Sequence, residues 1–236
     1  MPRLTTIGFD ADDTLWHNEK HFHFTQSMFF ELLKDHAAAD HINERLLQAE
    51  KKNLGFYGFG IKGFTLSMIE TAIEVTEGKV PARTLQTILD AGRDMLHQPV
   101  ELLPQVQKTL AVLALEYKLI MITKGDLFDQ ERKVAASGLG DFFRAIEIVS
   151  DKTVETYGRI FSQQGTGTDQ GMMVGNSLKS DVIPALQAGA YGVHVPHELT
   201  WALEHEEAPQ HPRFNVVENL GSLPNLIQAL QQTDHT

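Results

Sequence analysis

Alternation of short apolar segments with amphipathic helical segments, from Leu103 to near the end of the chain, is the feature that most constrains the fold. The pattern predicts strands at 117–122, 145–149, 172–174, 192–195 and 214–217, and helices at 104–113, 130–137, 154–163, 179–188 and 223–230. Strands that alternate with helices form a parallel sheet with right-handed crossover connections. The sequence therefore predicts an α/β fold.

A further strand is predicted at the start of the chain, over residues 4–9, and three carboxylates follow it within four residues. Residues two apart in an extended segment point to the same side, so Asp10 and Asp12 can face one site while Asp13 faces elsewhere. Crowded carboxylates repel each other unless positive charge lies between them, and Mg²⁺ is the simplest cation for oxygen ligands. A solvated turn is the alternative interpretation of this motif taken alone.

Between these two parts, residues 19–98 have helical periodicity and no convincing strand. Four helices are predicted, near 22–33, 42–54, 64–75 and 84–96. Glycines alternate with aromatic residues at 55–64, which predicts either a packed turn or a loop that faces a substrate. The expected organisation is a core of residues 1–16 and 101–236 with an all-helical domain, 17–100, inserted into it.

Composition excludes several classes of protein. The chain of 236 residues has 20 Lys and Arg against 31 Asp and Glu, a net charge of −11, which argues against a nucleic-acid or anionic-membrane partner. It has no Cys, so disulfides and thiolate metal sites are excluded. Neither a signal segment nor an apolar run of membrane-spanning length is found, and a cytoplasmic location is the default expectation.

Polar residues follow four of the predicted strands at the end of each strand. They are Asp10 and Asp12, Thr123-Lys124-Gly125, Lys152, and Gly175-Asn176-Ser177 with Asp181. Ligands of parallel sheets bind at the carboxyl ends of the strands. We therefore expect these residues to form one active site.

These four motifs, in this order, resemble those of the haloacid dehalogenase-like hydrolase superfamily, most of whose members are phosphatases. The resemblance covers nearly the whole chain. It implies a doubly wound, Rossmann-like parallel-sheet core with a mobile helical cap of the C1 type inserted between the first and second motifs.

The resemblance also implies roles for the first two motifs. Asp10 corresponds to the nucleophile that forms an aspartyl-phosphate, and Asp12 to the general acid and base, whose carbonyl oxygen also reaches Mg²⁺. Thr123 offers its hydroxyl to a phosphate oxygen, and Gly125 lets the backbone approach the phosphate. Lys124 stands where Asn is commoner, so it is either an additional phosphate contact or merely exposed.

The last two motifs are expected to balance charge. Lys152 is placed to neutralise the phosphate and the nucleophile. Asn176 and Asp181 complete a metal site with Asp10 and Asp12, although relatives often have Asp in place of Asn176, which puts tight metal binding in doubt. In the helical domain, Tyr57 and Lys62 are expected to contact the substrate.

The function predicted from these residues is that of a Mg²⁺-dependent phosphatase acting on small phosphorylated metabolites through an aspartyl-phosphate. Alternatives on the same fold are a phosphomutase, which needs an intermediate protected from water, and a 2-haloacid dehalogenase, against which Asp12 argues. A catalytically weak phosphate-binding protein is a third alternative. A signalling receiver also has clustered Asp, Thr and Lys, but it has about half this length and no helical insertion.

Overall fold

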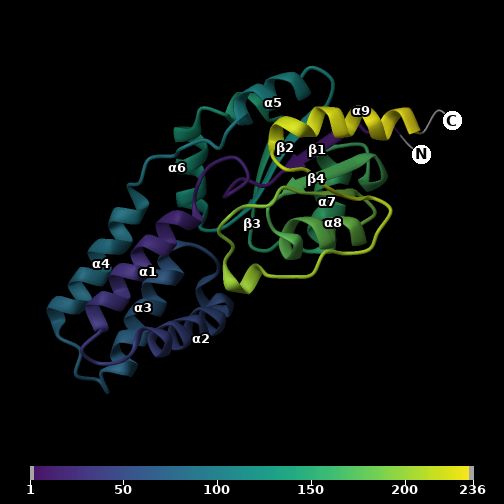
Figure 1. Ribbon diagram of the computed structural model, residues 1–236. Coiled ribbons are helices and arrows are strands. Elements are labelled where there is room, and N and C mark those ends of the chain that lie inside the picture. The colour runs from purple at the N-terminus through teal and green to yellow at the C-terminus, as the bar shows by residue number, and fades with distance from the viewer. Residues whose placement is uncertain (1–2, 234–236) are drawn as a thin grey trace. The chain divides into compact units, whose positions relative to one another are not determined.

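Six parallel strands form one sheet, as the alternation of segments predicted. The computed structural model describes residues 3–233. Its strands are β1 (Thr6–Phe9), β2 (Lys118–Lys124), β3 (Ala145–Val149), β4 (Gly171–Gly175), β5 (Tyr191–His194) and β6 (Phe214–Val216), and they lie in the order β3-β2-β1-β4-β5-β6 (Figure 1). This is the order of doubly wound Rossmann-like folds, so the predicted fold class is confirmed. The strand order reverses between β1 and β4, where such folds bind their ligands.

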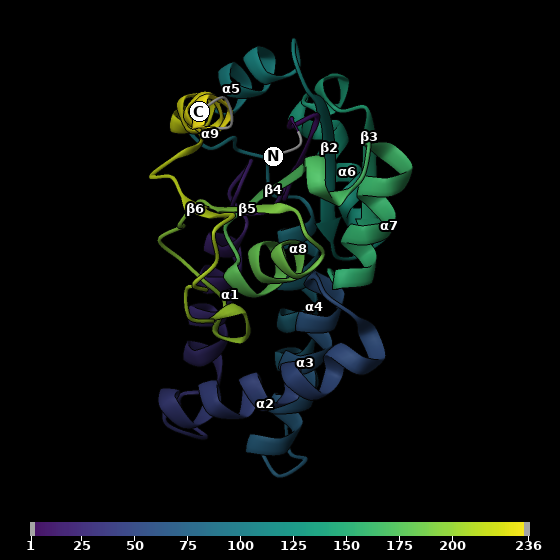
Figure 2. The same cartoon turned by 90° about the vertical axis from the view of Figure 1, so that its right-hand side faces the viewer.

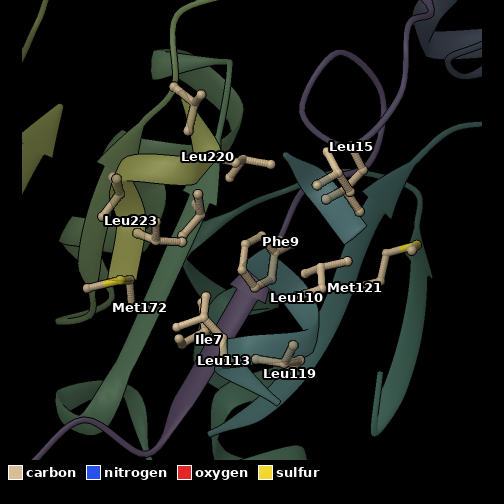
Figure 3. Close-up of a cluster of buried hydrophobic side chains, with 14 of the residues drawn as sticks. Ile7, Phe9, Leu15, Leu110, Leu113, Leu119, Met121, Met172, Leu220 and Leu223 are labelled. Atoms are coloured by element: carbon tan, nitrogen blue, oxygen red, sulfur yellow. The ribbon is translucent and has the colours of Figure 1, made fainter. Parts of the chain in front are cut away.

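Helices cover both faces of the sheet. On one face lie α5 (Val106–Leu113) and α9 (Leu223–Thr233), and on the other α7 (Val154–Gln164) and α8 (Ile183–Gln187) (Figure 2). The first face has the larger core, in which Ile7 and Phe9 of β1 pack with Leu110 and Leu223 (Figure 3). On the second face Tyr157 and Phe161 of α7 pack on Ile122 and Met173. Alternate residues of each strand therefore serve opposite cores.

The centre of the sheet requires a glycine in β1. A Cβ atom at Gly8 would lie 2.9 Å from Ile122 Cδ1 and 3.1 Å from Met173 Sδ, closer than side chains approach one another. The absence of a side chain lets both neighbouring strands pack tightly against β1.

The described chain divides into two compact units. The sheet and its helices belong to the first, made of residues 3–17, 100–124 and 130–233. The second comprises 18–99 and 125–129. Its helices are α1 (Glu19–Leu33), α2 (Ala39–Tyr57), α3 (Ile61–Val75) and α4 (Ala82–Leu96), and they enclose a core of their own that includes Phe29, Leu46 and Met68. Residues 125–129, predicted in the core domain, are thus grouped with the helices.

Three elements differ in extent from the prediction. β2 continues through Lys124, so Thr123 lies within the strand and not beyond it. α2 continues through Tyr57, which leaves Gly58–Gly60 as the connection to α3 where a loop over 55–64 was expected. A π-helical turn, Leu178–Val182, precedes α8, with Pro184 at the start of α8, where the missing N–H costs no hydrogen bond.

No helix in residues 3–233 combines the length and the apolar character needed to cross a membrane.

Candidate active site

The turn after β1 places Asp10 in a buried position. The backbone N–H of Asp10 donates to the carbonyl of Val174 in β4, 2.9 Å away, which continues the sheet by one residue. Asp13 then adopts a left-handed conformation, with φ of 58°, and this reverses the chain. The reversal brings Thr14 back onto Asp10, so that the Thr14 hydroxyl donates to Asp10 Oδ2 at 3.1 Å.

Lys152, which follows β3, joins two carboxylates in the interior. Its ammonium donates to Asp10 Oδ1, and to Asp181 Oδ1 at 2.6 Å, and all three side chains are buried. Burial together with the nearby Asp181 raises the pKa of Asp10 to about 7, although Lys152 acts in the opposite direction. Burial disfavours the charged Lys152, but the two carboxylates outweigh it and raise the pKa of Lys152.

The turn after β4 positions Asp181 and depends on a second close approach. The backbone N–H of Ser177 donates to Asp181 Oδ2 at 3.0 Å. A Cβ atom at Gly175 would lie 2.2 Å from that same oxygen. Gly175 is therefore needed for Asp181 to reach the site, which is a physical reason for glycine at the end of β4.

The amide of Asn176 faces the nucleophile. One terminal atom of this amide lies 3.2 Å from each of three oxygens: Thr14 Oγ1, Asp10 Oδ2 and the carbonyl oxygen of Asp12. With nitrogen at that position, the side chain donates hydrogen bonds to all three. With oxygen there, Asn176 accepts from Thr14 and joins Asp10 and Asp12 as a third oxygen that a cation can bridge.

The side chain of Asp12 is held by a separate set of donors. Lys133 Nζ lies 2.7 Å from both carboxylate oxygens, Trp16 Nε1 lies 2.7 Å from Oδ1, and Gln130 Nε2 lies 2.9 Å from Oδ2. Lys133 and Gln130 are buried residues of α6 (Leu127–Ser137). Burial alone would raise the pKa of Asp12, but Lys133 and the other donors hold it below its usual value.

Gln130 also connects Asp12 to the end of β2. Its Nε2 lies 3.1 Å from Thr123 Oγ1 and 2.8 Å from the carbonyl of Lys124. Its Oε1 is buried and has no hydrogen-bond partner among residues 3–233. The carboxylate of Asp12 and the hydroxyl of Thr123 are therefore two sides of one polar cluster.

Other predicted residues lie in different surroundings. Lys124 is partly buried and already has partners. Its ammonium lies 2.5 Å from Glu204 Oε1 and 2.7 Å from Ser180 Oγ. Gly125, Tyr57 and Lys62 belong to the second unit. There Tyr57 is exposed at the end of α2, and Lys62 pairs with Asp126 at 2.9 Å.

Of the four predicted metal ligands, the structure brings Asp10 and Asn176 together through their side chains and Asp12 through its carbonyl. The carboxylate of Asp12 is directed to Lys133, and that of Asp181 to Lys152 and Ser177. Within residues 3–233 no three His, Asp or Glu side chains gather as a metal site. Any site here consequently depends on a carbonyl and an amide oxygen.

Sequence reasoning missed Thr14, Trp16, Gln130, Lys133 and Glu204. Thr14 had a signal, because it lies within the turn that follows the first strand. Gln130 and Lys133 are three residues apart, which places them on one face of a predicted helix. Polar residues on a helix face usually face solvent, so that spacing alone did not indicate a buried role.

The sheet order and the buried carboxylates at its carboxyl edge are those of a Rossmann-like α/β protein with a buried aspartate directly after its first strand. The sequence model of the haloacid dehalogenase-like hydrolases matches residues 4–189, and the chain belongs to this family. The superfamily resemblance seen in the four motifs is thereby confirmed.

Solved structures agree with this assignment. A haloacid dehalogenase-like family hydrolase from Xanthomonas campestris is 39% identical, with a TM-score of 0.88 over 98% of this chain and 93% of that one. The HAD-hydrolase YfnB of Bacillus subtilis, bound to magnesium, is 15% identical, with a TM-score of 0.68 over 96% and 100%. L-2-haloacid dehalogenase of Xanthobacter autotrophicus is 20% identical, with a TM-score of 0.67 over 95% and 98%, and these last two show the fold alone. No curated protein matches the chain.

Proposed function

We propose that this hydrolase is a Mg²⁺-dependent phosphatase of small phosphorylated metabolites, with Asp10 as its nucleophile. The observation that carries the proposal is the pairing of the buried Asp10 with the buried ammonium of Lys152, beside an Asn176 amide whose terminal atom lies 3.2 Å from Asp10 Oδ2 and from the Asp12 carbonyl. Phosphoryl transfer needs an in-line nucleophile with positive charge beside it. A buried carboxylate paired with a lysine at the edge of the sheet meets that need.

The donor set fits magnesium. Oxygens that are neighbours in an octahedral Mg²⁺ shell lie about 3 Å apart, given bonds of about 2.1 Å. With its amide oxygen turned toward Asp10, Asn176 would lie 3.2 Å from Asp10 Oδ2 and from the Asp12 carbonyl, close to that value; with nitrogen there, the same contacts are hydrogen bonds. When bound, the ion would neutralise charge on Asp10 and on the phosphoryl oxygens. Asp181 acts on this set through Lys152, which it shares with Asp10.

The residues of the site divide the reaction between them. An oxygen of Asp10 attacks phosphorus, the bond from phosphorus to the ester oxygen breaks, and that oxygen takes a proton from Asp12. A water molecule then attacks the aspartyl-phosphate and gives its proton to Asp12, and the bond from phosphorus to Asp10 breaks to release phosphate. In this proposal Lys152 balances the negative charge, and the Thr123 hydroxyl, which accepts from Gln130 in this structure, donates to a phosphoryl oxygen.

The contacts of Asp12 favour the second of these steps. Four donor contacts hold its carboxylate ionised, which is the form that accepts a proton from water. The first step requires Asp12 to carry a proton, so its contacts with Lys133 must loosen at that stage. The donors around Asp12 are for this reason expected to influence which leaving groups react well.

We further propose that α1–α4 form the cap and that Tyr57 and Lys62 contribute to substrate choice. The exposure of Tyr57 and the position of Lys62 in the first turn of α3 support this role. Gly125 has a φ of 145°, a conformation that favours glycine and is consistent with a close approach of this backbone to a phosphate. Substitution of Tyr57 should then alter the preference among phosphate esters without altering the requirement for Mg²⁺.

A dehalogenase is the second candidate, and the orientation of the Asn176 amide is the observation that favours it. With nitrogen facing Asp10, the carboxylate is held by Lys152, Thr14 and Asn176 without a metal. Asp10 would then attack the carbon that bears a halogen and release halide, and water would hydrolyse the resulting ester. The presence of Asp12 argues against this chemistry, which does not require an acid at that position.

The deciding experiment measures phosphate release from p-nitrophenyl phosphate and from a panel of phosphorylated metabolites, with Mg²⁺ and after EDTA treatment. Halide release from 2-chloropropionate is measured in parallel. Phosphate release that is lost with EDTA and restored by Mg²⁺ supports the phosphatase. Halide release without phosphate release would support the dehalogenase and refute the phosphatase. If neither product is released, both candidates are refuted.

A further inference from the structure

The long loop between β5 and β6, residues 195–213, contacts the end of β2 through Glu204, which accepts from Lys124. It contains one short helical turn, Ala202–Glu204. Loops longer than about 15 residues without regular structure are uncommon in compact domains and often serve a function. This loop is tied down by Lys179, whose ammonium donates to the carbonyl of Leu203 at 2.7 Å, and by the side chain of Glu204.

Glu204 is a carboxylate enclosed by three donors. Its Oε1 lies 2.5 Å from Lys124 Nζ, and its Oε2 accepts from Ser177 Oγ and, at 2.6 Å, from Ser180 Oγ. Only 14% of its side chain is exposed. Burial would raise the pKa of Glu204, but Lys124 and the two hydroxyls lower it, so the group is held as an anion. One ammonium and two hydroxyls thus already bind an oxyanion in this structure.

Each of these three donors is next in sequence to a residue of the candidate site. Lys124 follows Thr123 at the end of β2, Ser177 follows Asn176, and Ser180 precedes Asp181. The backbone N–H of Ser177 donates to Asp181 Oδ2 at 3.0 Å, and Lys152 donates to Asp181 Oδ1 at 2.6 Å, so the donors are joined to the Asp10–Lys152 pair through Asp181. A carboxylate is an unexpected neighbour for a dianionic substrate, because like charges repel.

Charge balance gives Glu204 a role. When Asp10 is ionised, Asp10, Asp181 and Lys152 together carry one excess negative charge, and Lys133 pairs with Asp12. The ammonium of Lys124 is matched by Glu204, which lies on a loop and not on the sheet. Movement of this loop would release positive charge beside the site without disturbing the strands.

We propose that Lys124, Ser177 and Ser180 form an oxyanion subsite, which Glu204 fills in this structure and leaves when phosphate binds. The inference rests on the proposed phosphatase function and deepens it. Glu204 competes with phosphate for Lys124, which lowers the affinity of the site for the phosphate that the reaction releases. The loop 195–213 is then a gate supplied by the sheet unit itself.

The test measures calorimetric binding of inorganic phosphate to the full chain with Mg²⁺. Glu204→Gln removes the competing charge and should tighten phosphate binding about tenfold, the typical worth of one charge-assisted hydrogen bond. Lys124→Met removes the ammonium for which Glu204 and phosphate compete. Adding Glu204→Gln to Lys124→Met should therefore not change phosphate binding further. Glu207→Gln removes the same charge from an exposed position of the same loop and should have little effect.

Three results would overturn the inference: unchanged or weaker phosphate binding in Glu204→Gln, equal tightening in the Lys124→Met background, or equal tightening by Glu207→Gln. Thermal unfolding shows whether each variant folds, and Glu204→Ala provides a second variant that lacks the competing carboxylate. Release of phosphate from p-nitrophenyl phosphate is measured separately. If the enzyme is active but substitution of Glu204 does not change its affinity for phosphate, only the subsite is refuted. If every variant lacks both activity and phosphate binding, the phosphatase function is refuted as well.

Discussion

Lys133 Nζ lies 2.7 Å from both carboxylate oxygens of Asp12, so one buried lysine of α6 fixes the second carboxylate of the first motif. Gln130, one helical turn earlier, adds a contact to the same carboxylate. A side chain held on two sides has little freedom to rotate. The position of the Asp12 carboxylate therefore depends on a helix that lies far from it in the sequence.

We expect Lys133→Met to impair proton transfer by Asp12 while leaving the nucleophile in place. Breakdown of the phosphoenzyme should slow about tenfold or more for every substrate, because that step needs Asp12 ionised and Lys133 lowers its pKa. Lys133→Arg keeps the cation and should retain most activity. In the Asp12→Asn background Lys133→Met should have no further effect, because the two side chains act as a unit.

Glu131→Gln, at an exposed position of the same helix, is the control for general effects on α6. A loss of the same size in the Asp12→Asn background would mean that Lys133 only supports the fold.

Gly92 of α4 is in close contact with Thr65 of α3. A Cβ atom at Gly92 would lie 2.3 Å from Thr65 Oγ1, which also donates to the Ile61 carbonyl at 2.8 Å. Gly92→Ala should lower the free energy of unfolding by about 1–3 kcal/mol, because the two helices must move apart. Gly55→Ala is the matched control: a Cβ there meets nothing within 4 Å, so it should stabilise α2 by up to about 1 kcal/mol. Urea denaturation measures the free energy of unfolding of both variants and of the unsubstituted protein. If Gly92→Ala is as stable as Gly55→Ala, the close packing of Gly92 on Thr65 is contradicted.

Local patterns were sufficient to predict the sheet and the residues at its strand ends. Asp10, Thr123, Lys152 and Asn176 each follow or end an apolar segment, and parallel strands bring such ends to one edge. Hydrophobic periodicity likewise located the four helices of the second unit. The extent of α2 was wrong because Gly55 suggested a break, whereas an isolated glycine costs a helix only about 1 kcal/mol.

Contacts between residues that are far apart in the sequence could not be predicted from such local patterns. Lys133 is separated from Asp12 by 121 positions, and Glu204 from Lys124 by 80. Nothing in the immediate surroundings of Lys124 distinguishes a phosphate contact from a lysine paired with a loop. The fold decides between these alternatives, since it determines which carboxylate comes within reach.

Asn176 should limit the affinity for Mg²⁺ if its oxygen completes the donor set around Asp10. Asn176→Asp adds a negative charge to that set and should tighten Mg²⁺ binding, as carboxylates are stronger ligands for this ion than amides. Titration of Mg²⁺ by calorimetry, without substrate, measures this directly. Asn176→Ala should weaken binding and serves as the opposite variant. If neither substitution alters the titration, the amide nitrogen faces Asp10 and the side chain is not a ligand.

Asp10→Asn is expected to abolish turnover and phosphoenzyme formation together, because the amide cannot attack phosphorus. Asn is nearly the same size, and it removes one of two carboxylates that share Lys152, so the fold should survive. Asp12→Asn differs, since Asp12 acts on protons: a phosphoenzyme should still form from p-nitrophenyl phosphate, whose leaving group needs little protonation. Its formation from an alkyl phosphate should slow by about 10²–10⁴-fold. Acid quenching and detection of protein-bound phosphate from both substrates separates the two roles. A phosphoenzyme in Asp10→Asn, or an equal loss for both leaving groups in Asp12→Asn, would show that these aspartates do not act as nucleophile and acid.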